Sequence, residues 1–373
     1  MKKIFFWAPF NSNIGTIKSV INSIKSIKKY SGETINPVLV DATNEWKSYN
    51  DICEIIHLRK NKFDFRNIKN KGFFWSRLFY LNIFVSCFFK LDNEIKKHKP
   101  DYLIAHLVSS LPIMLFLLFS YNTKLILRIS GEPKLGFFRK LYWKLISKKI
   151  YAITCPSTET RHKLIDIFEK KKIHVLFDPV IEIQKINFNK KIKLKSKFLG
   201  MDYILAVGRL TKQKNFQFLI KNFKRLKLKY PKLNLIILGE GEEKNYIEGI
   251  IKKLSLTESV FLQGFENNVF NYLNNAKCLV MTSLYENPGH VLIEAAASNC
   301  PIISSDCPTG PREILMNGEA GYLFGVDNSE EFIKNFENFL NLKNKKIMLL
   351  NAKKKSMNYT LPRHYFNLHN IIY

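Results

Sequence analysis

The sequence predicts an α/β protein made of two doubly wound domains. Its 373 residues are many for a single hydrophobic core and suit two domains. Short apolar runs alternate with longer amphipathic segments, which is the pattern of parallel strands covered by helices. Glycine follows several of the apolar runs, as at Gly208, Gly239 and Gly264. Glycine at such positions lets a ligand come close to the ends of parallel strands.

The first half, residues 1–178, has the pattern of one such domain. Residues 3–8 are an apolar run that stops at Pro9, which suits a short buried strand and is too short for a secretory signal. Further strands are expected at 37–41, 51–58, 102–105, 124–129, 152–155 and 174–177. Helices are expected at 15–29, 73–98, 109–119, 137–147 and 157–168.

The second half, residues 201–350, alternates more regularly. Strands are expected at 203–207, 234–238, 260–263, 278–281, 302–304 and 321–324. Helices are expected at 216–229, 243–254, 269–275, 291–298, 310–316 and 329–342. Residues 179–200 are rich in lysine without a clear period and are predicted to be a linker, and residues 351–373 form a polar, then aromatic tail.

The composition limits the class of protein. The formal net charge is +28, and residues 1–200 hold 37 Lys+Arg against 15 Asp+Glu. Such basicity fits nucleic acid, an anionic membrane or an acidic ligand, but the sequence shows no recognition helix or aromatic–basic module typical of nucleic-acid binding. The six cysteines include no Cys-x-x-Cys pair, which argues against structural zinc and favours reduced thiols in the cytoplasm. No run reaches the ~20 apolar residues of a spanning helix.

The segment from Glu286 to Glu294 carries the clearest chemical signal. Two carboxylates bracket Pro288-Gly289, and an apolar run follows. We expect Pro288 in a first helical turn, with free N–H groups directed at an anion. Carboxylates accept hydrogen bonds from sugar hydroxyls. The segment therefore suits a nucleotide sugar, and the alternative is an amphipathic helix with two solvated glutamates.

The Glu-x7-Glu spacing resembles the signature of retaining glycosyltransferases of family 4, which have the GT-B fold. Arg209 and Lys214, after a strand and Gly208, resemble the element that holds the donor diphosphate in this family. Two further strand ends, at 239–241 and 263–265, match positions near the base and ribose. The resemblance covers nearly all of residues 201–325. It implies two Rossmann-like domains facing a cleft, with a C-terminal helix crossing back onto the N-terminal domain.

The resemblance also implies roles for individual residues. Glu286 would bind hydroxyls of the transferred sugar and Glu294 the ribose. One departure is Asn287-Pro288, where many members have Gly-Phe, so the identity of the sugar is not carried over. The implied donor-binding set is Gly15, Gly208, Gly239, Gly264, Phe265, Pro288, Gly289, His290, Val291 and Glu294, and the implied catalytic set is His106, Glu286, Arg209 and Lys214.

The first half is expected to supply the acceptor side. Gly15, with Asn13 before it, occupies the place of a Gly-Gly loop beneath the donor phosphates, although an ordinary strand-to-helix turn fits equally. His106 at a strand end matches the family's active-site histidine and would bind the transferred sugar or organise the acceptor. Arg128 and Glu132 follow another strand and are further acceptor-side candidates.

Two segments suggest a membrane surface. Residues 73–89 contain eight aromatic residues and are followed by four lysines, and residues 137–150 place lysines and apolar residues on opposite sides of a helix. An apolar helix with a basic face suits an anionic membrane. A core helix with a solvated face is the alternative for either segment.

The sequence thus predicts a retaining glycosyltransferase that moves a hexose-type sugar from a nucleotide-diphosphate donor to a lipid-linked glycan acceptor. The expected context is bacterial surface polysaccharide, such as lipopolysaccharide, at the inner face of the cytoplasmic membrane. No Asp-x-Asp motif is seen, so neither a metal nor another cofactor is expected, and no nucleic acid is expected as a partner. The alternatives are a non-catalytic GT-B protein that binds glycan or a partner, and another GT-B enzyme such as an epimerase or phosphorylase.

Overall fold

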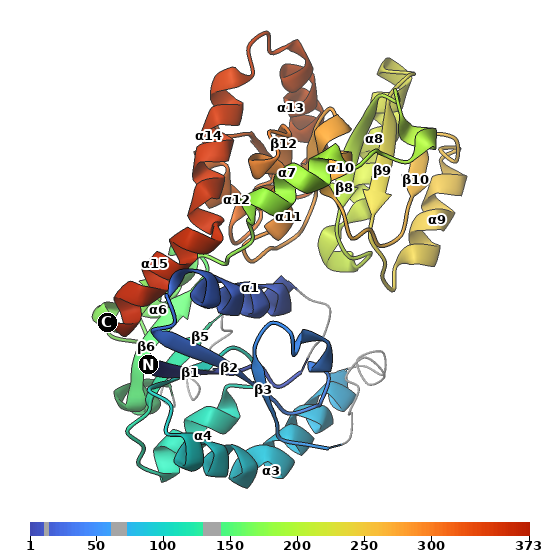
Figure 1. Cartoon of the computed structure of the whole chain (residues 1–373). Coiled ribbons are helices and arrows are strands. Elements are labelled where there is room, and N and C mark those ends of the chain that lie inside the picture. Colours follow the sequence, from blue (N-terminus) through green and yellow to red (C-terminus); the bar gives the residue numbers. More distant parts are fainter. Residues whose placement is uncertain (11–14, 61–72, 130–142) are drawn as a thin grey trace. The chain divides into compact units, whose positions relative to one another are not determined.

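The computed structural model describes residues 1–10, 15–60, 73–129 and 143–373. These residues form two compact units (Figure 1). The first contains Met1–Pro179 together with Leu361–Tyr373, and the second contains Val180–Thr360. Each unit is built on one parallel sheet covered by helices, so the predicted α/β class is confirmed.

The sheet of the first unit has seven strands in the order β3-β2-β1-β4-β5-β6-β7. All its pairs are parallel, and β1 lies between β2 and β4. Strands buried on both faces read as continuous apolar runs, which is why β1 and β4 were recognisable in the sequence. The strands are β1 (Lys2–Trp7), β2 (Ile35–Asp41), β3 (Glu54–His57), β4 (Tyr102–Ala105), β5 (Lys124–Arg128), β6 (Ile150–Cys155) and β7 (Ile173–Val175).

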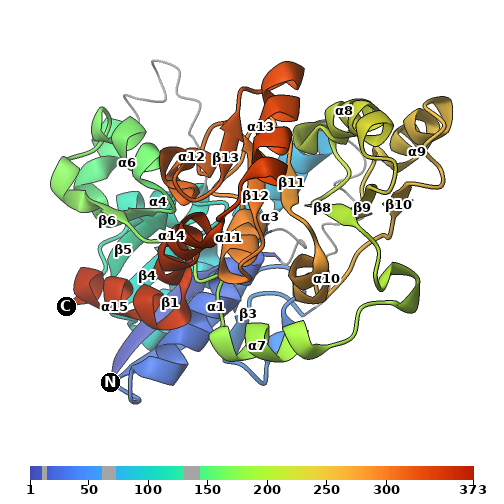
Figure 2. The ribbon, with the colours of Figure 1, turned by 90° about the horizontal axis from the view of Figure 1, so that it is seen from above.

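Helices cover both faces of this sheet. On one face α3 (Phe73–His98), α4 (Ser110–Leu118) and α6 (Thr158–Ile165) share a core with alternate strand residues such as Phe5. On the other face α1 (Gly15–Tyr30) and α15 (Leu361–Ile372) pack side by side over residues such as Phe6 (Figure 2). The C-terminal helix therefore belongs to the first unit, and Leu368 is 1% exposed in its core.

The sheet of the second unit has six parallel strands in the order β10-β9-β8-β11-β12-β13 (Figure 2). Helices α8, α9 and α13 fill one core with the strands, and α11 packs against β11 and β12. The strands are β8 (Tyr203–Val207), β9 (Asn234–Leu238), β10 (Val260–Leu262), β11 (Leu279–Met281), β12 (Ile302–Ser305) and β13 (Tyr322–Phe324). The helices are α7 (Ile183–Lys191), α8 (Phe216–Lys229), α9 (Lys244–Lys253), α10 (Phe270–Asn275), α11 (His290–Ala297), α12 (Pro311–Ile314), α13 (Ser329–Asn341) and α14 (Lys346–Ser356).

The structure differs from the predicted elements at residues 179–200. This lysine-rich segment contains α7 and is part of the second unit, where α7 packs against α10. Only Ile186 and Asn189 of α7 are buried, so the helix has no clear apolar period in the sequence. The helix predicted at 137–147 lies largely outside the described residues.

Candidate functional site

Three strand-end glycines of the second unit lie against one another. The N–H of Gly208 donates to Leu238 at 2.9 Å, and the N–H of Gly239 donates to Gly264 at 2.7 Å. Gly239 has φ +140, and a Cβ there would lie 1.9 Å from the carbonyl oxygen of Gly208. Only glycine permits this approach. The loops after β8, β9 and β10 therefore meet at the carboxyl edge of the sheet, where open α/β sheets bind ligands.

Lys214 and Glu286 form an ion pair at the same edge. Nζ of Lys214 contacts Oε1 of Glu286, and the Ser283 hydroxyl donates to the same oxygen at 2.5 Å. The Lys214 backbone is held because Thr282 Oγ1 donates to its carbonyl at 3.0 Å. Glu286 is 8% exposed. Two of the residues predicted to be catalytic, separated by 72 positions in the chain, are thus in direct contact.

Two exposed side chains directly follow two of these strand-end glycines in the sequence. Arg209 follows Gly208 directly after β8, and its side chain is exposed. Phe265 follows Gly264 after β10 and is 66% exposed. A guanidinium binds phosphate oxygens in a bidentate manner, and an exposed ring offers a face for stacking.

The Glu286–Gly289 loop leads into α11. Gly289 has φ +95 and is the N-cap of the helix, which begins at His290. Pro288 therefore precedes the helix, and the prediction that it lies in the first helical turn is wrong because the left-handed Gly289 separates them. The first N–H groups of a helix have no intrahelical acceptor and favour an anion. Glu294, 7% exposed, lies further along α11.

A second loop, residues 306–310, holds the first one in place. The N–H of Glu286 donates to Pro308 at 2.6 Å, and the N–H of Thr309 donates back to the carbonyl of Glu286 at 3.0 Å. A Cβ on Gly310 would lie 2.1 Å from the carbonyl oxygen of Pro288. Neither this loop nor Ser283 was predicted to belong to the site. The signal available was the Pro-Thr-Gly-Pro run that begins four residues after a predicted strand.

His106 lies at the end of β4 in the first unit. Its backbone N–H donates to the carbonyl of Trp7 at 3.1 Å, and its ring stacks on Phe6 with centroids 5.8 Å apart. Both ring nitrogens are buried without a hydrogen-bond partner among the described residues, although part of the residue reaches the surface. Burial, and then the charge of Arg128, lower the pKa of His106 to about 3. The imidazole is therefore neutral at physiological pH and can donate one hydrogen bond and accept another.

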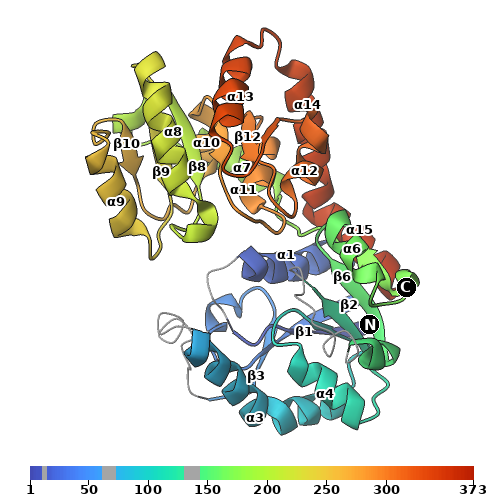
Figure 3. The same ribbon diagram turned by 180° about the vertical axis from the view of Figure 1, so that it is seen from behind.

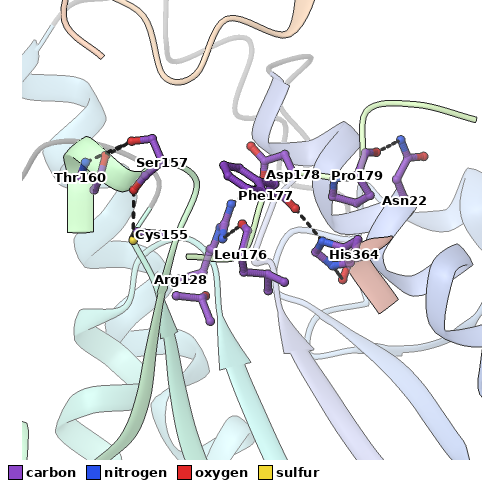
Figure 4. Close-up of polar contacts among 12 residues, drawn as sticks. Asn22, Arg128, Cys155, Ser157, Thr160, Leu176, Phe177, Asp178, Pro179 and His364 are labelled. Atoms are coloured by element: carbon purple, nitrogen blue, oxygen red, sulfur yellow. Dashed lines mark hydrogen bonds and ion pairs between the residues drawn. The ribbon is translucent and has the colours of Figure 1, made fainter. Parts of the chain in front are cut away.

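Arg128, at the end of β5, is also buried in the first unit. Its guanidinium donates to the carbonyl of Leu176 and to the carboxylate of Asp178, both at 2.6 Å (Figure 4). His364 of α15 contacts the carbonyl of Phe177 at 2.7 Å through Nδ1. The structure thus places Arg128 in an ion pair that holds residues 176–178. His106, Arg128, Asp178 and His364 all line one small pocket of the first unit.

The remaining predicted residues are placed only in part. Gly15 begins α1, whereas Asn13 and Glu132 lie outside the described residues. Within the described ranges, no group of three or more His, Cys, Asp or Glu side chains is arranged to hold a metal ion. No helix in the same part of the chain is long and apolar enough to cross a membrane.

Residues 187–356 match the family Glycosyl transferases group 1. The matched range contains every site residue of the second unit described above. The resemblance to glycosyltransferases is therefore confirmed at the level of a group 1 domain.

Two relatives agree with this domain. An uncharacterized glycosyltransferase of Methanocaldococcus jannaschii is 35% identical over 255 residues, 61% of each chain. The N-acetylgalactosamine-N,N'-diacetylbacillosaminyl-diphospho-undecaprenol 4-alpha-N-acetylgalactosaminyltransferase of Campylobacter jejuni is 31% identical over 235 residues, 60% of this chain and 62% of the relative. The match thus spans about three fifths of the length of these two relatives.

The fold is shared over the whole chain. A TarM mutant of S. aureus, solved with Fondaparinux, alpha-GlcNAc-glycerol and UDP, aligns with a TM-score of 0.74 at 16% identity and covers 100% of both chains. With the two parallel sheets, this likeness confirms the predicted GT-B fold.

Proposed function

We propose that the chain is a retaining glycosyltransferase that moves a hexose-type sugar from a nucleotide-diphosphate donor to a lipid-linked glycan. The observation that carries the proposal is the contact between Lys214 and Glu286 beside three interlocked glycine loops. At one edge of the sheet, Lys214 offers a cation for phosphate and Glu286 a carboxylate for sugar hydroxyls. The glycines offer backbone without side chains, which the nucleotide can approach. The solved TarM structure contains UDP, which supports a nucleotide sugar as donor.

The charges at this edge suit a leaving diphosphate. Arg209 and Lys214 supply two cations, and the N-terminus of α11 adds the positive end of a helix dipole. Preorganised positive groups stabilise negative charge that develops in the transition state. The proposed reaction is therefore metal-independent, and an oxygen of the leaving phosphate takes the proton of the acceptor hydroxyl. His106 is proposed to hydrogen-bond the transferred sugar or the acceptor.

The acceptor and location follow from the relatives and the charge. The Campylobacter relative acts, by its name, on a diphospho-undecaprenol glycan. We extend this acceptor class, and a role in bacterial surface polysaccharide, to the present chain. A lipid-linked acceptor requires peripheral binding at the inner face of the cytoplasmic membrane, and the excess of Lys+Arg in residues 1–200 supports that location.

Thermal-shift measurements of the purified chain with UDP-, GDP-, ADP- and CMP-sugars test the proposal. A ligand that binds the native state raises the melting temperature. We expect one nucleotide class to raise it without added metal, and Arg209→Ala and Lys214→Ala to remove the shift. Arg225→Ala and Lys229→Ala are matched controls, because these two cations of α8 pair with Glu330 and Glu337 of α13.

Transfer is then measured with the nucleotide sugar that binds. Retention of the anomeric configuration in the product, and activity that survives a chelator, support the retaining, metal-independent reaction. Donor binding without transfer to any lipid-linked glycan would favour a non-catalytic GT-B binding protein. No shift with any nucleotide sugar, from folded protein, contradicts the proposal.

A further inference from the structure

Helix α3 carries an unusual row of exposed apolar side chains. Leu78 is 40% exposed, Leu81 58%, Val85 69% and Phe89 68%. Their spacing of three, four and four residues puts all of them on one side of the helix. We call these four residues the α3 stripe. Helix α4 packs beside α3 (Figures 1 and 3). Its residue Leu118 is a further apolar side chain that is exposed, at 63%.

The stripe is separate from the side of α3 that packs on the sheet. Phe79, Ile83 and Cys87 are at most 2% exposed and belong to the core of the first unit. In the aromatic run that suggested a membrane in the sequence, the described side chains of Phe79, Tyr80, Phe84 and Phe88 belong to this core or pack against it. The α3 stripe itself is aliphatic apart from Phe89. The four residues of the stripe are therefore not part of the core of the first unit.

The exposed charged side chains of α3 are all cationic. Arg77, Lys90, Lys96 and Lys97 of α3 are exposed. The two acidic residues of the helix are already engaged: Asp92 accepts from Lys96 at 2.8 Å and from the Tyr121 hydroxyl at 2.5 Å, and Glu94 lies 3.2 Å from His98. An apolar row with cations on its flanks matches a surface of lipid with anionic head groups.

From this geometry we infer that the α3 stripe is the surface by which the first unit docks on an anionic lipid bilayer. The inference deepens the membrane location proposed above and rests on that proposal. Leu78, Leu81, Val85 and Phe89 enter the head-group region, and the long side chains of the flanking cations place their charges among the lipid phosphates. The helix lies along the surface and does not cross it, since its other side is buried in the protein core.

A second copy of the chain fits this surface less well. Two copies that meet through the stripe would bring the exposed cations of one α3 helix near those of the other, and like charges across an interface oppose association. Anionic lipid provides the opposite charge and requires no shape complementary to a single row of side chains.

Flotation of the full chain with vesicles tests the docking surface. The vesicles contain phosphatidylcholine alone or with phosphatidylglycerol, at about 0.1 M and about 0.5 M salt, where screening differs strongly. We expect binding only to the anionic vesicles and weaker binding at the higher salt. The variant Leu81→Ser/Val85→Ser/Phe89→Ser should bind at least about tenfold more weakly, because three exposed apolar side chains no longer leave water.

Two further variants separate the contributions. Lys90→Glu/Lys97→Glu should weaken binding at low salt while leaving the stripe intact. Ile347→Ser/Leu350→Ser is the matched control, since these residues of α14 in the second unit are 70% and 62% exposed. Melting temperature, and the thermal shift with nucleotide sugar, should be the same in all variants because every substituted side chain is exposed.

Each outcome decides a different point. Unchanged vesicle binding by the triple serine variant, or loss of binding in the α14 control, overturns the assignment of the surface. A wild-type chain that ignores anionic vesicles yet binds a nucleotide sugar overturns the docking and leaves the proposed donor site standing. A wild-type dimer that the triple serine variant converts to a monomer would show that a second copy covers the stripe, and would also overturn the inference.

Discussion

At the scale of single residues, the contact between Lys214 and Glu286 can be tested by a single substitution. Glu286→Gln keeps the size of the side chain and removes its charge. We expect transfer to fall roughly a hundredfold, the effect of losing a charged hydrogen bond worth about 3 kcal/mol. Steady-state rates with the identified donor provide the measurement. Glu330→Gln is the control, because Glu330 is an exposed partner of Arg225 on α13.

The two buried histidines of the first unit predict a pH dependence of stability. Burial is the main reason that the pKa of His106 falls to about 3 and that of His364 to about 4. An unfolded histidine binds a proton near pH 6.5. Between these values the unfolded state binds more protons than the folded one, so the free energy of unfolding decreases as the pH is lowered.

Denaturant unfolding at several pH values between about 4 and about 7 measures this slope. His106→Asn removes one of these groups and should make the slope shallower. His162→Asn, at an exposed position on α6, should leave it unchanged. An identical slope in the His106 variant would show that its imidazole titrates normally in the folded protein.

At the scale of elements, the 306–310 loop is predicted to position the donor loop. Gly310 and Gly318 have similar positive φ angles, +115 and +106, but only Gly310 would place a Cβ against Pro288. Alanine at Gly318 carries the backbone strain alone, about 1 kcal/mol. Alanine at Gly310 adds a steric clash of roughly 1–3 kcal/mol and displaces the loop that carries Glu286.

Melting temperature and transfer activity, measured together, separate the two variants. We expect Gly310→Ala to lose stability, donor binding and transfer, whereas Gly318→Ala loses stability only. Equal activity in the two would mean that the 306–310 loop does not position Glu286.

The elements also show what a sequence can and cannot provide. Helix α3 was predicted with its observed bounds because a long apolar segment ends in a lysine-rich turn, and β8 was equally clear because all of its residues are apolar or aromatic. Helix α7 was missed because two buried residues produce no period. The contact of Lys214 with Glu286 was predictable as a shared site through the family resemblance. Its support by Ser283 and Thr309 was not, since hydrogen bonds between loops leave no pattern in the chain.

At the scale of the whole molecule, the first unit depends on the last residues of the chain. Helix α15 shares a core with α1, and the Ser26 hydroxyl donates to the carbonyl of Leu361 at 2.6 Å. Ser23 and His364 lie 2.8 Å apart in the same interface. Such contacts join positions more than 300 residues apart, and no local pattern in the sequence indicates them.

This closure predicts that a substitution near the C-terminus weakens the N-terminal unit. Leu368 is 1% exposed, so Leu368→Ala should destabilise the first unit by about 2–5 kcal/mol. Phe366 on the same helix is 54% exposed, and Phe366→Ala should change stability by less than about 0.5 kcal/mol.

Hydrogen exchange of the intact protein can locate the effect of Leu368→Ala. Protection should decrease in β1, α1 and β4 and persist in β8 and β9, because the core of the second unit contains no residue of α15. An equal loss of protection in both units would show that they unfold as one cooperative body.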